Sequence, residues 1–133
     1  MIHHFLEQSA SDFPDKEAVI TETRRATYTQ INHQSNQLAR LLMAHGVNAR
    51  DTVVLIMDNS VEYVISYYAV LKTGAAVVPF SNDLKPATID HLLRELAPKA
   101  VISSKKFERL LNACRLSDSS ISLMVRLKQG RDW

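Results

Sequence analysis

Apolar residues recur along the chain at two spacings, one typical of helices and one of strands, and the two alternate. Over residues 29–45 the apolar positions fall at helical spacing with polar side chains between them, which predicts an amphipathic helix. Thr27 and Gln30 form a capping-box pattern at its start. Gly46 follows the last apolar position, where a left-handed backbone is expected to end the helix.

A second helix is predicted over residues 61–73 by the same spacing. The polar residues 58–60 precede it and supply candidate N-caps, with Glu62 three residues after Asn59 in another capping-box pattern. Gly74 ends this helix in the way that Gly46 ends the first.

Two further helices are expected in the second half of the chain. Pro86 suits a first-turn position, and the helix that it begins closes before Pro98. The apolar stripe of this helix consists of Ile89, Leu92, Leu93 and Leu96. Ser104 is a candidate cap for a fourth helix, which carries Phe107, Leu110 and Leu111.

Strands are predicted between these helices. Residues 18–20 form a first short strand, and 100–102 form another. The continuous apolar run over 52–57 predicts a strand covered on both faces, and 75–78 is a second buried-strand candidate. Residues 121–127 alternate between apolar and polar, which predicts a strand with one wet face.

The alternation of strands and helices predicts an α/β fold: an open, mostly parallel sheet with helices on both faces. We expect one domain over residues 1–133, with a possible irregular tail at 117–133, where a serine-rich segment begins. Ligands of such sheets gather at the carboxyl ends of the strands, which here are residues 58–59, 79–82 and 103–104.

Composition excludes several classes of protein. The chain has 133 residues with 16 Lys and Arg against 14 Asp and Glu, too even a balance to indicate a nucleic acid partner. The single cysteine, Cys114, excludes an intrachain disulfide framework and a multi-cysteine zinc site. No apolar run approaches the ~20 residues of a membrane span, and no secretory signal opens the chain. We therefore expect a cytoplasmic location.

Glycine usage bears on nucleotide binding. The only three glycines are Gly46, Gly74 and Gly130, and no two are close together. A phosphate-cradling loop needs several glycines within a few residues so that the backbone can approach the anion. The chain therefore carries no recognisable nucleotide loop.

Two stretches together resemble the first two core motifs of the AMP-forming ligases. The first motif is similar to Thr-Tyr-Thr-Gln-Ile at 27–31, Ser-Asn-Gln-Leu-Ala-Arg-Leu-Leu at 35–42 and Gly-Val at 46–47. The second is similar to residues 59–62 and to Ala-Val-Leu-Lys-Thr-Gly-Ala-Ala-Val-Val-Pro at 69–79. The start of the family also fits 13–15 and 18–20, and its later segments fit 84–86 and 100–103. Arg50-Asp51 stands where the family often has Gly-Asp, and Phe80-Ser81 precedes Asn82 where an aliphatic residue is usual.

This superfamily covers acyl- and aryl-CoA synthetases, luciferases and the adenylation domains of peptide synthetases, and the resemblance implies an ATP-dependent carboxylate ligase of the fatty-acid or acyl-CoA type. Such enzymes use ATP and magnesium to form an acyl-adenylate and then pass the acyl group to a thiol, usually coenzyme A. Family members are several times longer, and their phosphate loop, ribose-binding Asp and C-terminal catalytic Lys have no counterpart here. The implied chain is an N-terminal fragment truncated before the phosphate loop, a scaffold that is inactive alone.

Under this interpretation no catalytic, cofactor-binding or metal residue is assigned within the chain. Its expected partner is the missing remainder of the ligase, or a second copy that covers exposed apolar surface. Two alternatives stay open: a stand-alone interaction module, or a split subunit that completes a longer partner chain. An unrelated receiver-like domain is disfavoured, because no acidic cluster lies at the ends of the early strands.

For each residue with candidate chemistry, a purely structural role is favoured. Lys72 suits either an anion contact or the negative end of a helix dipole. The histidines lack metal-ligand spacing and accompanying carboxylates; they are His3, His4, His33, His45 and His91. Cys114 follows an apolar helix face, which favours packing over nucleophilic chemistry.

The remaining candidates are aromatic, basic and capping residues. Tyr63, Tyr67 and Tyr68 could form a binding stripe, but core packing is favoured, with Tyr67 on the exposed side. Residues 24–25, both arginine, are explained by a hairpin turn. Residues 58–59 lie at the best location for a site, yet helix capping accounts for them.

Overall fold

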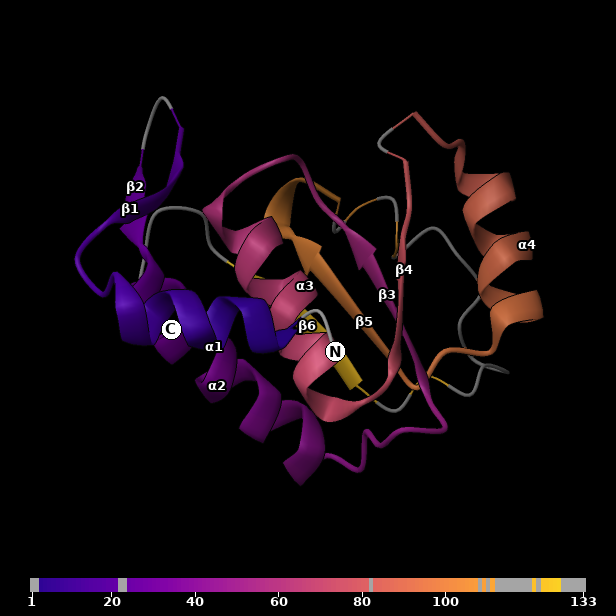
Figure 1. Ribbon diagram of the computed structural model, residues 1–133. Coiled ribbons are helices and arrows are strands. Elements are labelled where there is room, and N and C mark those ends of the chain that lie inside the picture. Colours follow the sequence, from indigo (N-terminus) through magenta and orange to yellow (C-terminus); the bar gives the residue numbers. More distant parts are fainter. Residues whose placement is uncertain are drawn as a thin grey trace.

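The computed structural model describes residues 3–21, 24–81, 83–107, 109, 111, 121 and 123–127. Helices and strands alternate along most of this chain (Figure 1). The elements are α1 (His3–Asp12), β1 (Glu17–Ile20), β2 (Arg25–Thr27), α2 (Tyr28–Ala44), β3 (Thr52–Ile56), α3 (Val61–Thr73), β4 (Ala76–Pro79), α4 (Pro86–Leu96), β5 (Ala100–Ser104), the 3₁₀ turn η1 (Lys105–Phe107) and β6 (Leu123–Leu127).

A four-stranded parallel sheet forms the centre of the fold. Its strand order is β4-β3-β5-β6, and every described neighbour is parallel. In β3, the side chains of Val53 and Leu55 face one layer of the core and those of Val54 and Ile56 face the other. All four are fully buried, which confirms that this strand is covered on both faces.

Helices cover both faces of the sheet, as the sequence predicts. α2 and α3 pack on one face, where Leu38, Leu42 and Val70 contact the inward side chains of the strands. α4 packs on the other face through Ile89 and Leu93. Figure 1 shows α1 lying across α2 and α3, on the side away from the sheet.

The ends of α2 and α3 follow local sequence signals. Thr27 caps α2, and Gln30 completes the capping box by accepting a hydrogen bond from the Thr27 backbone N–H. Gly46 and Gly74 have φ angles of +92° and +84°, the left-handed values expected after these helices. The three helices predicted over residues 29–45, 61–73 and 86–97 are confirmed.

Two expectations about the strands are wrong, and a third is confirmed. β1 does not join the parallel sheet; it pairs antiparallel with β2 in a separate hairpin. β4, which was predicted to be buried, lies at one edge of the sheet with β3 as its one described neighbour, so its side chains are only partly covered. The strand predicted at 121–127 is present as β6, so this part of the tail is regular, and its alternating burial confirms one wet face.

Two expectations about helices also need correction. α1 was not predicted, because it buries only Leu6 and its apolar pattern is weak. Ser104 does not cap the fourth helix; it ends β5, and residues 105–107 form a 3₁₀ turn, after which the described residues Arg109 and Leu111 are helical as predicted. Leu110, Cys114 and the serine-rich segment at 117–120 lie outside the described residues.

No helix in the described part of the chain combines the length and apolar character needed to cross a bilayer.

Gly74→Ala should destabilise the protein more than Gly46→Ala. Both glycines have positive φ, so alanine costs about 1–2 kcal/mol at either site. At Gly74 the added Cβ also meets the Ala49 Cβ at 3.3 Å, whereas at Gly46 it meets the flexible end of Lys99 at 3.6 Å. Urea denaturation of both variants measures the difference, and equal losses would contradict the close approach of the α3 end to Ala49.

Candidate functional site

The carboxyl edge of the parallel sheet is the location where the fold class places ligands. Asp58 follows β3 and Lys106 follows β5, and the Lys106 Nζ lies 3.1 Å from the Asp58 Oδ2. Both side chains are substantially exposed, so this ion pair contributes little to stability. Ser103 and Ser104, at the end of β5, are buried, and the Ser104 Oγ has no hydrogen-bond partner among the described residues. Asn82, predicted at this edge, lies outside them.

The capping of α3 differs from the prediction in its details. Ser60 is the N-cap: its Oγ accepts a hydrogen bond from the Tyr63 N–H at 3.1 Å and donates one to the Asp58 carbonyl oxygen. Asn59 and Glu62 do not form the predicted capping box. Glu62 is instead turned toward a partner from a distant part of the chain.

That partner is Arg24, which sequence analysis assigned only to a hairpin turn. The Arg24 Nη1 lies 2.7 Å from the Glu62 Oε1, and these side chains are only 16% and 4% exposed. The Arg24 Nη2 also donates to the Gln34 Oε1 at 3.2 Å. This buried network ties the β1–β2 hairpin to α2 and to the first turn of α3. A buried carboxylate needs such a partner, because desolvation without compensation is costly.

Lys72 has a larger structural role than an anion contact or a favourable position at a helix dipole, the two roles that its sequence position suggests. Its side chain is only 7% exposed, and its Nζ donates to the Glu7 Oε1 at 3.0 Å and to the Asn32 Oδ1 at 2.9 Å. Lys72 lies on α3, Glu7 on α1 and Asn32 on α2. The ammonium group therefore joins three helices, and the helix-dipole explanation alone is insufficient. The hydrogen bond from Lys72 also lowers the pKa of Glu7 below its usual value.

Apart from the neighbours His3 and His4, the histidines occupy separate positions. His3 and His4 contact each other edge to face near the start of α1. Burial, and then His4, lower the pKa of His3. The His45 Nδ1 lies 2.9 Å from the Leu41 carbonyl oxygen, and His91 pairs with Glu95 within α4. Within the ranges that the structure describes, no three His, Cys, Asp or Glu residues come close enough to hold a metal ion.

The three tyrosines of α3 divide between two packing layers. Tyr63 and Tyr67 stack with ring centroids 6.4 Å apart and pack against the core on the sheet side. Tyr67 is therefore half-buried, which corrects its predicted exposure. Tyr68 packs on the opposite side, toward α1 and α2. Burial, and then the neighbouring Tyr67, raise the pKa of Tyr63.

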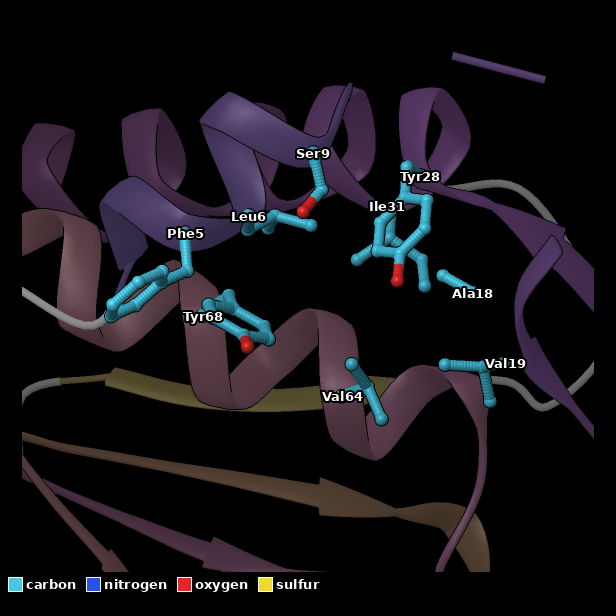
Figure 2. A pocket seen from close by; sticks show the side chains of 9 residues that line it. All are labelled: Phe5, Leu6, Ser9, Ala18, Val19, Tyr28, Ile31, Val64 and Tyr68. Carbon is cyan, nitrogen blue, oxygen red and sulfur yellow. The ribbon is translucent and has the colours of Figure 1, made fainter. Parts of the chain in front are cut away.

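A cavity of about 310 Å³ opens between α1, the β1 strand, α2 and α3 (Figure 2). Of its lining residues, the sequence indicated only Tyr68 as a chemical candidate, because the cavity forms where α1 and β1 come to lie against α2 and α3. The lining consists of Phe5, Leu6, Ser9, Ala18, Val19, Tyr28, Ile31, Val64 and Tyr68. Two further hollows, of about 360 and 330 Å³, lie beside Glu7 on α1.

In the described part of the chain, oppositely charged side chains that lie close together form ion pairs. Arg24 with Glu62 and Lys72 with Glu7 are cross-links between elements. The geometry thus assigns them to holding the helices and the hairpin in place, whereas the cavity in Figure 2 has no charged side chain in its lining.

Known proteins are similar to almost the whole length of this chain. The sequence profile of the family described as AMP-binding enzyme matches residues 6–132. The chain is similar to tyrocidine synthase 1 of Brevibacillus parabrevis, with 37% identity over 84% of this chain and 10% of the relative. It is also similar to an adenylate-forming reductase of Coprinopsis cinerea, with 33% identity over 96% of this chain and 12% of the relative. The chain thus spans about a tenth of the length of these two curated relatives.

Solved structures share the fold. The anthranilate CoA ligase AuaEII in complex with anthranoyl-AMP matches with a TM-score of 0.89 and 26% identity, over 94% of this chain and 24% of that one. A fatty acyl CoA synthetase of Mycobacterium tuberculosis matches with a TM-score of 0.87 and 29% identity, over 95% of this chain and 26% of that one. The predicted α/β fold class is confirmed.

Breaking the buried Arg24–Glu62 pair should destabilise the protein strongly. Arg24→Met or Glu62→Gln leaves one buried group without its ionic partner, at an expected cost of about 3 kcal/mol. The double variant R24M/E62L should be much closer to wild type, because no isolated buried charge remains. The exposed pair Arg25–Glu17 is the matched control, and Arg25→Met should cost less than about 1 kcal/mol. Equal losses for Arg24→Met and Arg25→Met in urea denaturation would contradict this assignment.

Stability should fall in acid partly through Glu7. The folded-state pKa of Glu7 is lowered, so its contribution is present above the unfolded pKa and is lost as pH falls through the folded value. Glu7→Gln should therefore flatten the decline in unfolding free energy as pH falls below the unfolded pKa of Glu7, and Lys72→Met should do the same. The exposed Asp15→Asn is the control. An unchanged pH profile in both variants would show that the Lys72 contact does not form in solution.

Proposed function

The chain belongs to the family of AMP-binding enzymes, which confirms the resemblance seen in its motifs, and from this membership we propose that it forms the N-terminal α/β part of an AMP-forming carboxylate ligase. The observation that carries the proposal is the match of residues 6–132 to the family profile. The fold likeness to the two CoA ligase and synthetase structures supports it.

The proposed reaction of the complete ligase has two steps. A carboxylate oxygen attacks the α-phosphorus of ATP, pyrophosphate leaves, and an acyl-adenylate remains; a thiol, of the coenzyme A class, then attacks the acyl carbon and AMP leaves. Magnesium would neutralise the phosphates in the first step. The proposal gives this chain no atom that touches the phosphates.

The described residues do not fit ATP and magnesium. Gly46 and Gly74 each end a helix, so neither belongs to a loop that could cradle phosphates. The buried cations Arg24 and Lys72 are already paired with carboxylates. We therefore derive no step of the reaction through these residues, and the chain's role in the proposal is that of a scaffold.

The partner in this proposal is the remainder of the ligase. The chain spans about a quarter of the two solved relatives, so most of each relative lies beyond the matched part. Apolar side chains exposed on α1, after α1 and on β1 are available to such a partner: Phe5 at 73%, Phe13 at 57% and Ile20 at 61%. A second copy of the chain would cover the same residues. Sedimentation velocity of the chain alone distinguishes this second copy from the remainder of the ligase, because only the second copy makes the chain sediment as a dimer.

Carboxylate-dependent exchange of labelled pyrophosphate into ATP tests the proposal. The 133-residue chain alone should show no exchange with any acid. A chimera in which this chain replaces the matched part of the anthranilate CoA ligase should show anthranilate-dependent exchange. Exchange by the chain alone would contradict the scaffold role. A folded chimera without exchange, beside an active parent ligase, would contradict the assignment to the ligase N-terminal part.

A further inference from the structure

The cavity between α1, β1, α2 and α3 is lined by six apolar side chains and by three side chains that carry a hydroxyl (Figure 2). Leu6 and Ile31 form the most deeply buried walls, with 3% and 1% of their surface exposed. Phe5 is a lining residue with 73% of its surface exposed, so its ring is free to pack on an occupant. Ligand sites in proteins commonly combine such apolar walls with few polar groups.

Three hydroxyl groups supply the polar part of the lining. Figure 2 shows the hydroxyls of Ser9 and Tyr28 directed from α1 and α2 toward α3, where Tyr68 stands. None of the three makes a hydrogen bond to another residue in the described part of the chain. A hydroxyl both donates and accepts, so these groups match a ligand that carries a hydroxyl of its own.

Charge narrows the class of ligand further. The nine lining residues include no Asp, Glu, Lys, Arg or His. A carboxylate or an ammonium group would therefore lose its hydration without gaining an ionic partner, which is costly. The lining thus favours an uncharged molecule over the carboxylates used by ligases.

The volume of the cavity limits the size of the ligand. A cavity of about 150 Å³ accommodates a molecule such as benzene, and this cavity measures about 310 Å³. It therefore has room for two fused rings, or for one ring with a short alkyl chain. Phe5, Tyr28 and Tyr68 provide aromatic surfaces against which such rings can pack.

We propose that this cavity is a binding site for a small uncharged aromatic alcohol, of the phenol or naphthol class. The site is separate from the ligase reaction proposed above, which needs a carboxylate and ATP. The ligand's rings lie between α1 and α3, and its hydroxyl exchanges hydrogen bonds with Ser9 and Tyr28.

Titration of the isotope-labelled chain with 2-naphthol, followed by amide NMR, tests the proposal. Saturable shifts confined to the lining residues are expected, with a dissociation constant on the order of 0.1–1 mM for a ligand of this size. 2-Naphthoate, which has the same rings and a negative charge, should bind at least about tenfold more weakly. Comparable binding of 2-naphthoate, or shifts spread over the molecule, would overturn the proposal.

Variants locate the binding. Ala18→Leu fills the cavity from β1 and should abolish binding, while Ala87→Leu on the exposed side of α4 should leave it unchanged. Tyr28→Phe removes one hydroxyl without changing the walls and should weaken binding about three- to tenfold.

If Ala18→Leu fails to fold, Tyr28→Phe and Ser9→Ala still test the proposal, and unchanged affinity in both variants would overturn it. Shifts of the same residues with protein concentration alone would mean that a second copy fills the groove, which would also overturn it.

Discussion

Helix α3 must be covered on two opposite sides, and the rest of the structure is arranged to do this. Ala69 and Val70 pack on the core between α2 and the sheet, whereas Val61 and Ile65 pack on the layer formed by α1, α2 and β2. A helix that is apolar around most of its circumference is stable in water only when it is enclosed. The sheet supplies one cover, and α1 with the β1–β2 hairpin supplies the other.

Because α3 is enclosed, the charged side chains on it need polar partners. Glu62 lies on the enclosed part of α3, and its charge is matched by Arg24 from the hairpin. At the other end of the helix Lys72 is matched by Glu7 and Asn32. The Ser35 Oγ donates to the Ile65 carbonyl oxygen at 3.1 Å between them. These contacts fix the position and direction of the covering elements, because each needs a particular partner atom, which apolar packing alone does not require. They also explain why residues within the two family motifs serve the scaffold.

Local signals predicted the elements of the sheet and its three main helices, whereas contacts between distant residues escaped prediction. The apolar run of β3, the capping box of α2 and the glycines after α2 and α3 each act within a few residues, so the sequence displays them directly. Arg24 and Glu62 are 38 positions apart, and no local pattern links them. α1 and the cavity depend on that same distant packing, since α1 buries a single side chain, Leu6.

Native-state hydrogen exchange measures most directly whether α3 is enclosed as described. If both covers are in place in solution, the amides of Ile65, Ala69 and Val70 exchange only through global unfolding, together with the central strands β3 and β5. The exposed face of α4 gives an internal comparison and should exchange faster. Exchange of the α3 amides at the rate of α4 or faster would show that the second cover is open, and the central claim would then be wrong.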